Sequence, residues 1–213
     1  MIRARILVLA ATKGGAGKTT LASALAIRAA ERGERIAIVD RDPSRGLKDW
    51  YSRRRNKEAL ALLEVDGTAE NIGLISARGY DWIIVDTPPL LQEHIEEAVS
   101  WADLVLIPSR VSALDLTAIH PVINVCRDYG RSFALVLNAV DPRHRMTKSA
   151  AAYLADHGRV MSTMIADRVA YAAAMLHGRG PSEIDGGEKA AEEMDALWSE
   201  IKGLVRRVKH ARE

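Results

Sequence analysis

The chain has little cysteine: Cys126 is the single thiol among its 213 residues. One thiol can form neither an intramolecular disulfide nor the paired ligands of an iron–sulfur cluster, so the sequence excludes disulfide-stapled domains and iron–sulfur reductases. Cys126 lies in an apolar segment with helical spacing, where we expect a buried and unreactive thiol. A reducing cytoplasm is the simplest location for such a chain.

Long hydrophobic runs are also missing. No stretch approaches the roughly 20 apolar residues that a membrane-spanning helix needs. The N-terminal run Ile6–Ala11 follows basic residues, as in a secretory signal, but it is too short for one. We therefore expect a protein that is soluble or at most peripheral to a membrane, and cytoplasmic.

The sequence has no excess of one charge. Its 30 lysines and arginines face 28 acidic residues, which gives a net charge of +2 and does not by itself indicate a polyanionic partner. Contact with nucleic acid would have to come from local basic clusters. There are three such clusters: residues 41–57, the set Arg143, Arg145 and Lys148, and the C-terminal set Lys202, Arg206, Arg207, Lys209 and Arg212.

Hydrophobic residues make up 48% of the chain, which is typical of a folded protein, and the length fits one domain, residues 1–213. Short apolar runs rich in Ile, Val and Leu alternate with longer helical patterns. Strands that are apolar on both faces are typical of a parallel sheet buried between helices, so we predict a doubly wound, mostly parallel α/β fold. The predicted strands are Ile6–Ala11, Arg35–Asp40, Ala61–Val65, Trp82–Asp86, Leu104–Pro108 and Phe133–Asn138, with a weaker seventh at Arg159–Thr163.

The predicted helices lie between these strands. They are Thr19–Arg32, 45–57, 91–101, 113–128 and 147–157, followed by an amphipathic C-terminal helix over about 187–210. Apolar residues of the last helix recur at intervals of three and four residues. Either it packs on the sheet, or it contacts DNA or a membrane.

A glycine-rich loop joins the first strand to the first helix. Its sequence is Lys13-Gly14-Gly15-Ala16-Gly17-Lys18-Thr19-Thr20. Backbone N–H groups of such a loop, together with the positive end of the helix, bind phosphates. We expect Lys18 to reach the β- and γ-phosphates, Thr19 to ligate magnesium and Thr20 to contact the α-phosphate.

Thr12 and Lys13, at the start of this loop, indicate which class of phosphate-binding loop it belongs to. Thr12 stands where an ordinary Walker A motif has its first glycine, and Lys13 follows it. This arrangement resembles the deviant Walker A ATPases of the ParA/MinD type. The resemblance implies that Lys13 crosses a dimer interface and contacts the partner's nucleotide.

Further segments carry the same resemblance over about residues 5–175. Val39-Asp40-Arg41-Asp42-Pro43 is similar to the Asp-x-Asp-Pro element of ParA proteins, and Trp82–Pro89 to their Walker B strand and turn. Leu114-Asp115 and Asp167–Tyr171 look like the short ParF-like branch. By position, the resemblance implies that Asp86 and Asp40 support magnesium and that Asp42 orients the attacking water.

Base specificity has a weaker basis in the sequence. Asn138-Ala139-Val140-Asp141 resembles the guanine-reading element of GTPases, but the lysine of that element is missing. The presence of Lys13 favours ATP. Asn138 is a candidate for contact with the base edge.

The resemblance implies a weak, partner-stimulated ATPase with ATP and Mg²⁺ as ligands. It would cycle between an ATP-bound dimer and an ADP-bound monomer to position plasmid or chromosomal DNA or a protein cargo. Nonspecific DNA, the nucleoid and a small ParB-like adaptor are the expected partners, and a membrane is not. A MinD-like membrane-associated regulator and a small-molecule ligase are the alternatives.

Overall fold

A six-stranded, all-parallel sheet forms the centre of the computed structural model, which describes residues 3–64, 79–89 and 92–210. The strand order is β3-β2-β4-β1-β5-β6. Chain order differs from spatial order in the doubly wound manner, which confirms the predicted fold class. The strands are β1 (Arg5–Leu9), β2 (Ile36–Asp40), β3 (Leu60–Leu63), β4 (Trp82–Asp86), β5 (Leu104–Ser109) and β6 (Phe133–Leu137).

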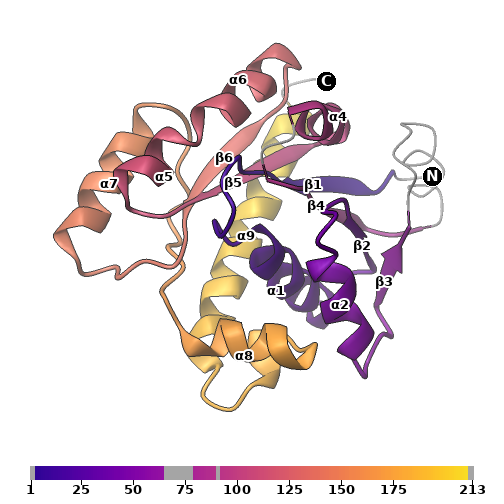
Figure 1. Cartoon of the computed structure of the whole chain (residues 1–213). Coiled ribbons are helices and arrows are strands. Elements are labelled where there is room, and N and C mark those ends of the chain that lie inside the picture. Colours follow the sequence, from indigo (N-terminus) through magenta and orange to yellow (C-terminus); the bar gives the residue numbers. More distant parts are fainter. Residues whose placement is uncertain (1–2, 65–78, 90–91, 211–213) are drawn as a thin grey trace.

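Helices cover both faces of the sheet (Figure 1). One face carries α1, α2, α8 and α9, and the other carries α4, α6 and α7. The helices are α1 (Lys18–Glu31), α2 (Gly46–Arg53), α4 (Gln92–Trp101), α5 (Ala113–Thr117), α6 (His120–Asp128), α7 (Arg145–Ala155), α8 (Val169–His177) and α9 (Glu188–His210), with a short 3₁₀ turn η1 (Pro181–Glu183).

Alternate residues of each strand enter different cores. In β1, Leu7 and Leu9 pack with α1 and α9, whereas Ile6 and Val8 pack with α4 and α6. This is why the strands are apolar throughout instead of alternating with polar residues. The pattern that predicted a parallel sheet therefore has its cause in the two helical layers.

The register brings three strand ends to one edge. Leu9 at the end of β1 pairs with Asp86 at the end of β4, and Asp86 pairs with Asp40 at the end of β2. Ligands of doubly wound folds bind outside the carboxyl ends of such strands. The sheet thus places both carboxylates beside the loop that follows β1.

Two predicted elements differ from the structure. The helix predicted over 113–128 is two helices, because Pro121 lacks an N–H and its ring excludes the carbonyl four residues earlier, at Thr117, where α5 ends. The weak strand Arg159–Thr163 is wrong. It forms one isolated bridge through Val160, after which the N–H groups of Ser162 and Thr163 donate to the Glu200 carboxylate instead of to a strand.

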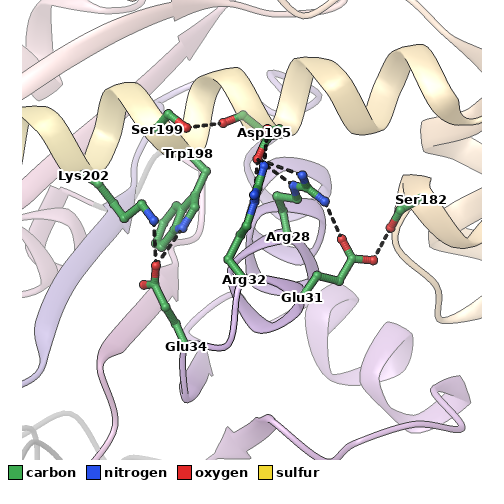
Figure 2. A network of polar contacts seen from close by, with 9 residues as sticks. All are labelled: Arg28, Glu31, Arg32, Glu34, Ser182, Asp195, Trp198, Ser199 and Lys202. Carbon is green, nitrogen blue, oxygen red and sulfur yellow. Dashed lines mark hydrogen bonds and ion pairs between the residues drawn. The ribbon is translucent and has the colours of Figure 1, made fainter.

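Helix α9 runs along α1 and is fixed to it by polar contacts (Figure 2). Asp195 accepts hydrogen bonds from Arg28 and Arg32, while Glu34 accepts from Trp198 and Lys202. The apolar side of the helix is buried in the core through Ala190, Met194, Leu197, Trp198, Ile201, Leu204 and Val205. Of the two sequence interpretations of this helix, the structure bears out packing on the sheet.

Nowhere in the described part of the chain is a helix both long and apolar enough to cross a membrane.

Candidate nucleotide-binding site

The loop between β1 and α1 leaves the positive end of a helix open. Gly15 and Gly17 have φ angles of 74° and 96°, which side chains rarely tolerate. Gly17 is the N-cap of α1, no side chain caps the helix, and no acidic residue lies in its first turn. The first N–H groups of α1 are therefore available to an anion from outside the chain.

Asn138 supports this loop from the end of β6. Its Nδ2 donates to the carbonyl of Ala16 at 2.7 Å, and the side chain is buried. A Cβ at Gly17 would lie 2.0 Å from the same Nδ2, so only glycine allows this close approach. The geometry gives Asn138 a role in holding the loop, while its contact with a base stays a prediction.

Lys18 is the first residue of α1 and is 5% exposed. Burial lowers the pKa of its ammonium group, while the charges of Asp86 and Asp42 oppose the shift. An anion that binds beside such a poorly hydrated ammonium group stabilises its charge strongly. The position suits a phosphate ligand at the mouth of the loop.

Thr19 and Asp86 form the second part of the site. The Thr19 Oγ1 donates to Asp86 Oδ2 at 2.6 Å, Asp86 is fully buried, and its Oδ1 has no hydrogen-bond partner among the described residues. Burial, only partly opposed by the bond from Thr19, raises the pKa of Asp86 to about 7. A hydroxyl beside a carboxylate oxygen that lacks a partner fits a hydrated magnesium ion.

The described residues contain no cluster of three or more His, Cys, Asp and Glu side chains that could bind a metal by itself. Mg²⁺ usually keeps several waters and takes one or two protein ligands together with phosphate oxygens. Thr19 and Asp86 supply such a partial set.

Replacement of Asp86 by asparagine should stabilise the nucleotide-free protein at high pH. The folded pKa lies above the ordinary 3.8, so ionisation of Asp86 costs stability as the pH rises from about 4 to 7, and the full penalty remains above that range. The neutral amide of Asp86→Asn would avoid the penalty. We expect a gain of about 2–4 kcal/mol at pH 8 and roughly half of that at pH 5, measured by urea unfolding with EDTA present.

Asp128→Asn, at an exposed carboxyl at the end of α6, is the control for the loss of one negative charge. A gain for Asp86→Asn that is absent at pH 8, or equal at both pH values, would contradict the burial argument.

The segment after β2 encloses Asp40 and Asp42. Asp40 accepts backbone hydrogen bonds from Asp42 at 3.0 Å and from Lys48 at 2.8 Å, and Asp42 accepts one from Ser44 at 2.8 Å. Burial raises the pKa of Asp40, and the N–H groups of Lys48 and Asp42 oppose the shift. One carboxylate thus fixes both the turn and the start of α2.

A cavity of about 410 Å³ opens beside this turn, at the ends of β2 and β3. Its lining includes Asp40, Asp42, Arg45 and Lys48. Arg41 also reaches this cavity, but its guanidinium group pairs with Glu97 at 2.6 Å and lies over Trp101. Arg41 therefore anchors the turn to α4.

Lys13 lies outside the group formed by Lys18 and the carboxylates. Its Nζ is 2.5 Å from Asp115 of α5, and its side chain is 43% exposed against 12% for Asp115. Burial acts against ionisation of Asp115, but the bonds from Lys13 and Ser112 outweigh it and lower the pKa of that carboxyl. Thr12 fixes the same region by donating to the carbonyl of Ala118 at 2.6 Å.

Sequence reasoning missed the role of Asp115. The pair Leu114-Asp115 marked a resemblance, but nothing in the spacing of residues 13 and 115 indicated an ion pair. In the described part of the chain, strands β2, β3, β4 and β5 lie between them.

Known proteins share this architecture and this loop. The sequence pattern of the CobQ/CobB/MinD/ParA nucleotide-binding domain matches residues 7–181. The chain belongs to this family. The match includes the loop, Asp40, Asp42, Asp86 and Asn138, and extends to the turn that follows α8.

Individual members are similar over nearly the whole chain. The maintenance of carboxysome distribution protein A of Halothiobacillus neapolitanus is 31% identical, covering 93% of this chain and 97% of its own length. Protein ParA of Rhizobium radiobacter is 28% identical, covering 81% and 83%. The structure of the septum site-determining protein MinD of Pyrococcus horikoshii with Mg-ADP superposes with a TM-score of 0.71 at 19% identity, covering 96% and 98%, which supports the fold.

Proposed function

We propose that this family member is a ParA-like ATPase that cycles between an ATP-bound dimer and an ADP-bound monomer to segregate or position DNA or a protein cargo. The observation that carries the proposal is the different environment of two lysines on one loop. Lys18 is buried within the influence of the Asp86 and Asp42 charges, whereas Lys13 is 43% exposed and paired with Asp115. One lysine suits the chain's own nucleotide, and the other can reach a nucleotide bound to a second copy.

In this proposal the loop residues Gly14, Gly15, Ala16 and Gly17 bind phosphates through their N–H groups. Lys18 neutralises the β- and γ-phosphates, and Thr20 contacts the α-phosphate. Thr19 and Asp86 would hold magnesium, with Asp40 supporting its water shell. The ion would supply charge neutralisation between phosphate oxygens.

Asp42 would orient the attacking water. It lines the cavity beside the turn, close enough to influence the charge of Lys18. Lys13 of the second copy would stabilise the charge that develops on the transferred phosphoryl group, as an arginine finger does. Because that lysine is paired with Asp115 in the single chain, hydrolysis would be weak until a partner stabilises the dimer.

The relatives support positioning as the output. One is named for carboxysome distribution and another is a ParA protein, so the cargo would be a protein body or DNA. A small adaptor would couple the cargo to the ATP-bound dimer on the nucleoid. A MinD-like membrane function has less support, because the apolar side of α9 is already buried.

An Asp42→Ala variant should bind ATP, dimerise and then stall, because Lys13, Lys18 and the magnesium ligands remain while the water loses its orienting carboxylate. We expect a fall in turnover of at least about 100-fold, with a dimer that outlives that of the wild type. Phosphate release and light scattering with ATP and magnesium measure both effects. Asp49→Ala removes an exposed carboxylate from α2 and should change neither.

Normal turnover in Asp42→Ala would assign the water to another residue. A variant that neither hydrolyses nor dimerises would place Asp42 in assembly instead of in hydrolysis.

A further inference from the structure

A second cavity lies away from the loop, where α2 and α8 end side by side. Its volume is about 310 Å³. It is lined by Arg53, Arg54, Arg55, Asn56, Leu176, His177, Gly178, Arg179 and Glu183, and we call it the arginine pocket.

Positive charge dominates this pocket. Four arginines and one histidine face a single acid, Glu183. Arg53, Arg55 and Arg179 are exposed. Arg53 and Arg55 form no ion pair with any residue that the structure describes, and Arg179 donates one hydrogen bond, from Nη1 to the carbonyl of Glu183 at 3.4 Å. Exposed guanidinium groups gathered around one cavity match the geometry of phosphate oxygens better than that of any neutral ligand.

The pocket is rigid at its base. The Arg54 side chain is 8% exposed and pairs with both carboxylate oxygens of Glu183 at 2.8 and 3.1 Å, while its buried Nε has no hydrogen-bond partner in the part of the chain that the structure describes. Trp50 donates to the carbonyl of Arg179 at 3.0 Å. At Gly178 (φ 64°) a Cβ would lie 2.6 Å from the backbone of Arg53 and Arg54. The ends of the two helices are therefore locked together.

Helix α2 connects the arginine pocket to the turn after β2 that contains Asp40 and Asp42. Its first turn contains Lys48, whose N–H is bound by Asp40, and its last residue is Arg53. The helix has 8 residues and so spans about 12 Å. A shift of Asp40 on nucleotide binding would be carried along this short, stiff element to the arginines.

We propose that the arginine pocket binds backbone phosphates of duplex DNA and that the nucleotide state sets its affinity through α2. This rests on the proposed function, which it deepens by naming the contact surface and its control. Backbone contact without base reading suits a concave basic site, because phosphates repeat along any sequence. Arg53, Arg55 and Arg179 make the contacts, and Arg54 positions them.

The test compares two triple variants of the full-length protein. The pocket variant is Arg53→Ala/Arg55→Ala/Arg179→Ala, which spares the structural Arg54. The matched control, Arg143→Ala/Arg145→Ala/Lys148→Ala, removes the same charge from exposed positions on α7 and the turn before it. Fluorescence anisotropy with a labelled duplex of mixed sequence is measured with ATP, with ADP and without nucleotide, at several salt concentrations. A fluorescent ATP analogue reports nucleotide binding.

We expect wild type and control to bind DNA with ATP only, and the pocket variant to bind at least about 10-fold more weakly with an unchanged affinity for the nucleotide. The slope of log affinity against log salt should fall by about 3 if each arginine neutralises one phosphate. Equal DNA binding by wild type and pocket variant would overturn this inference and leave the proposed function intact.

Two further outcomes would also overturn it. A pocket variant that no longer binds nucleotide would place these arginines in the switch instead of on DNA. A wild-type protein that hydrolyses ATP but binds DNA in no nucleotide state would remove the DNA clause of the proposed function together with this inference.

Discussion

A Lys18→Ala variant should lose nucleotide binding, with affinity for ATP and magnesium reduced by at least about 100-fold. The lysine replaced is buried at the first position of α1, where burial already lowers the pKa of its ammonium group. Each charge-assisted hydrogen bond to phosphate contributes about 1.5–3 kcal/mol, and one ammonium group between two phosphates makes two of them. Isothermal titration with ATP and magnesium measures the loss.

Unfolding would not explain such a loss. Lys18 is costly to bury in the nucleotide-free protein, so its removal should leave thermal stability unchanged or raise it. Lys189→Ala, at an exposed position near the start of α9, is the matched control and should bind ATP normally. Undiminished affinity in Lys18→Ala would contradict the assignment of the loop as the phosphate site.

Much of this site could be predicted because its main part is local in sequence. The strand, the glycine loop and the helix follow one another within residues 5–31, and each has its own pattern. Asp40 and Asp86 were also predictable as strand-end carboxylates, since parallel strands place their carboxyl ends at one edge. The partners of these carboxylates were harder to predict, because the hydrogen bond from Thr19 to Asp86 depends on the register of β1 against β4.

Most of the elements and contacts that the sequence did not predict depend on long-range packing. Helix α8 was not predicted, and its position follows from Tyr171, which donates to Glu193 of α9 and is buried against it. The break between α5 and α6 had a local cause in Pro121, which the helical spacing of the surrounding residues concealed. The ion pair of Lys13 with Asp115 links the loop after β1 to helix α5, and only the folded sheet brings the two together.

The ion pair with Asp115 fixes the position of the Lys13 side chain in the single chain. A lysine proposed to act on a second copy must first leave Asp115, and this costs a hydrogen bond to a largely buried carboxylate. A gain at the partner's nucleotide has to exceed this cost. Dimerisation would therefore require ATP, with its γ-phosphate charge, and would reverse when that phosphate is lost.

A Lys13→Ala variant should accordingly bind ATP as a monomer and fail both to dimerise and to hydrolyse. Affinity for ATP should stay within about 3-fold of the wild type, because Lys18 and the loop N–H groups remain in place, while turnover should fall by about 10³-fold or more, as for the loss of an arginine finger. Light scattering with ATP and magnesium reports the mass, and phosphate release reports the turnover.

The companion variant Asp115→Ala separates the two roles of the ion pair, since it frees Lys13 without removing it. If Asp115 only holds the lysine in the single chain, this variant should dimerise with ATP at a lower protein concentration than the wild type. If the carboxylate is also needed in the dimer, both variants should stay monomeric, and Lys13 alone would not account for assembly. A Lys13→Ala protein that still dimerises and turns over normally would make Lys13 an ordinary surface lysine, and the proposed cycle would then lack its link between the two nucleotides.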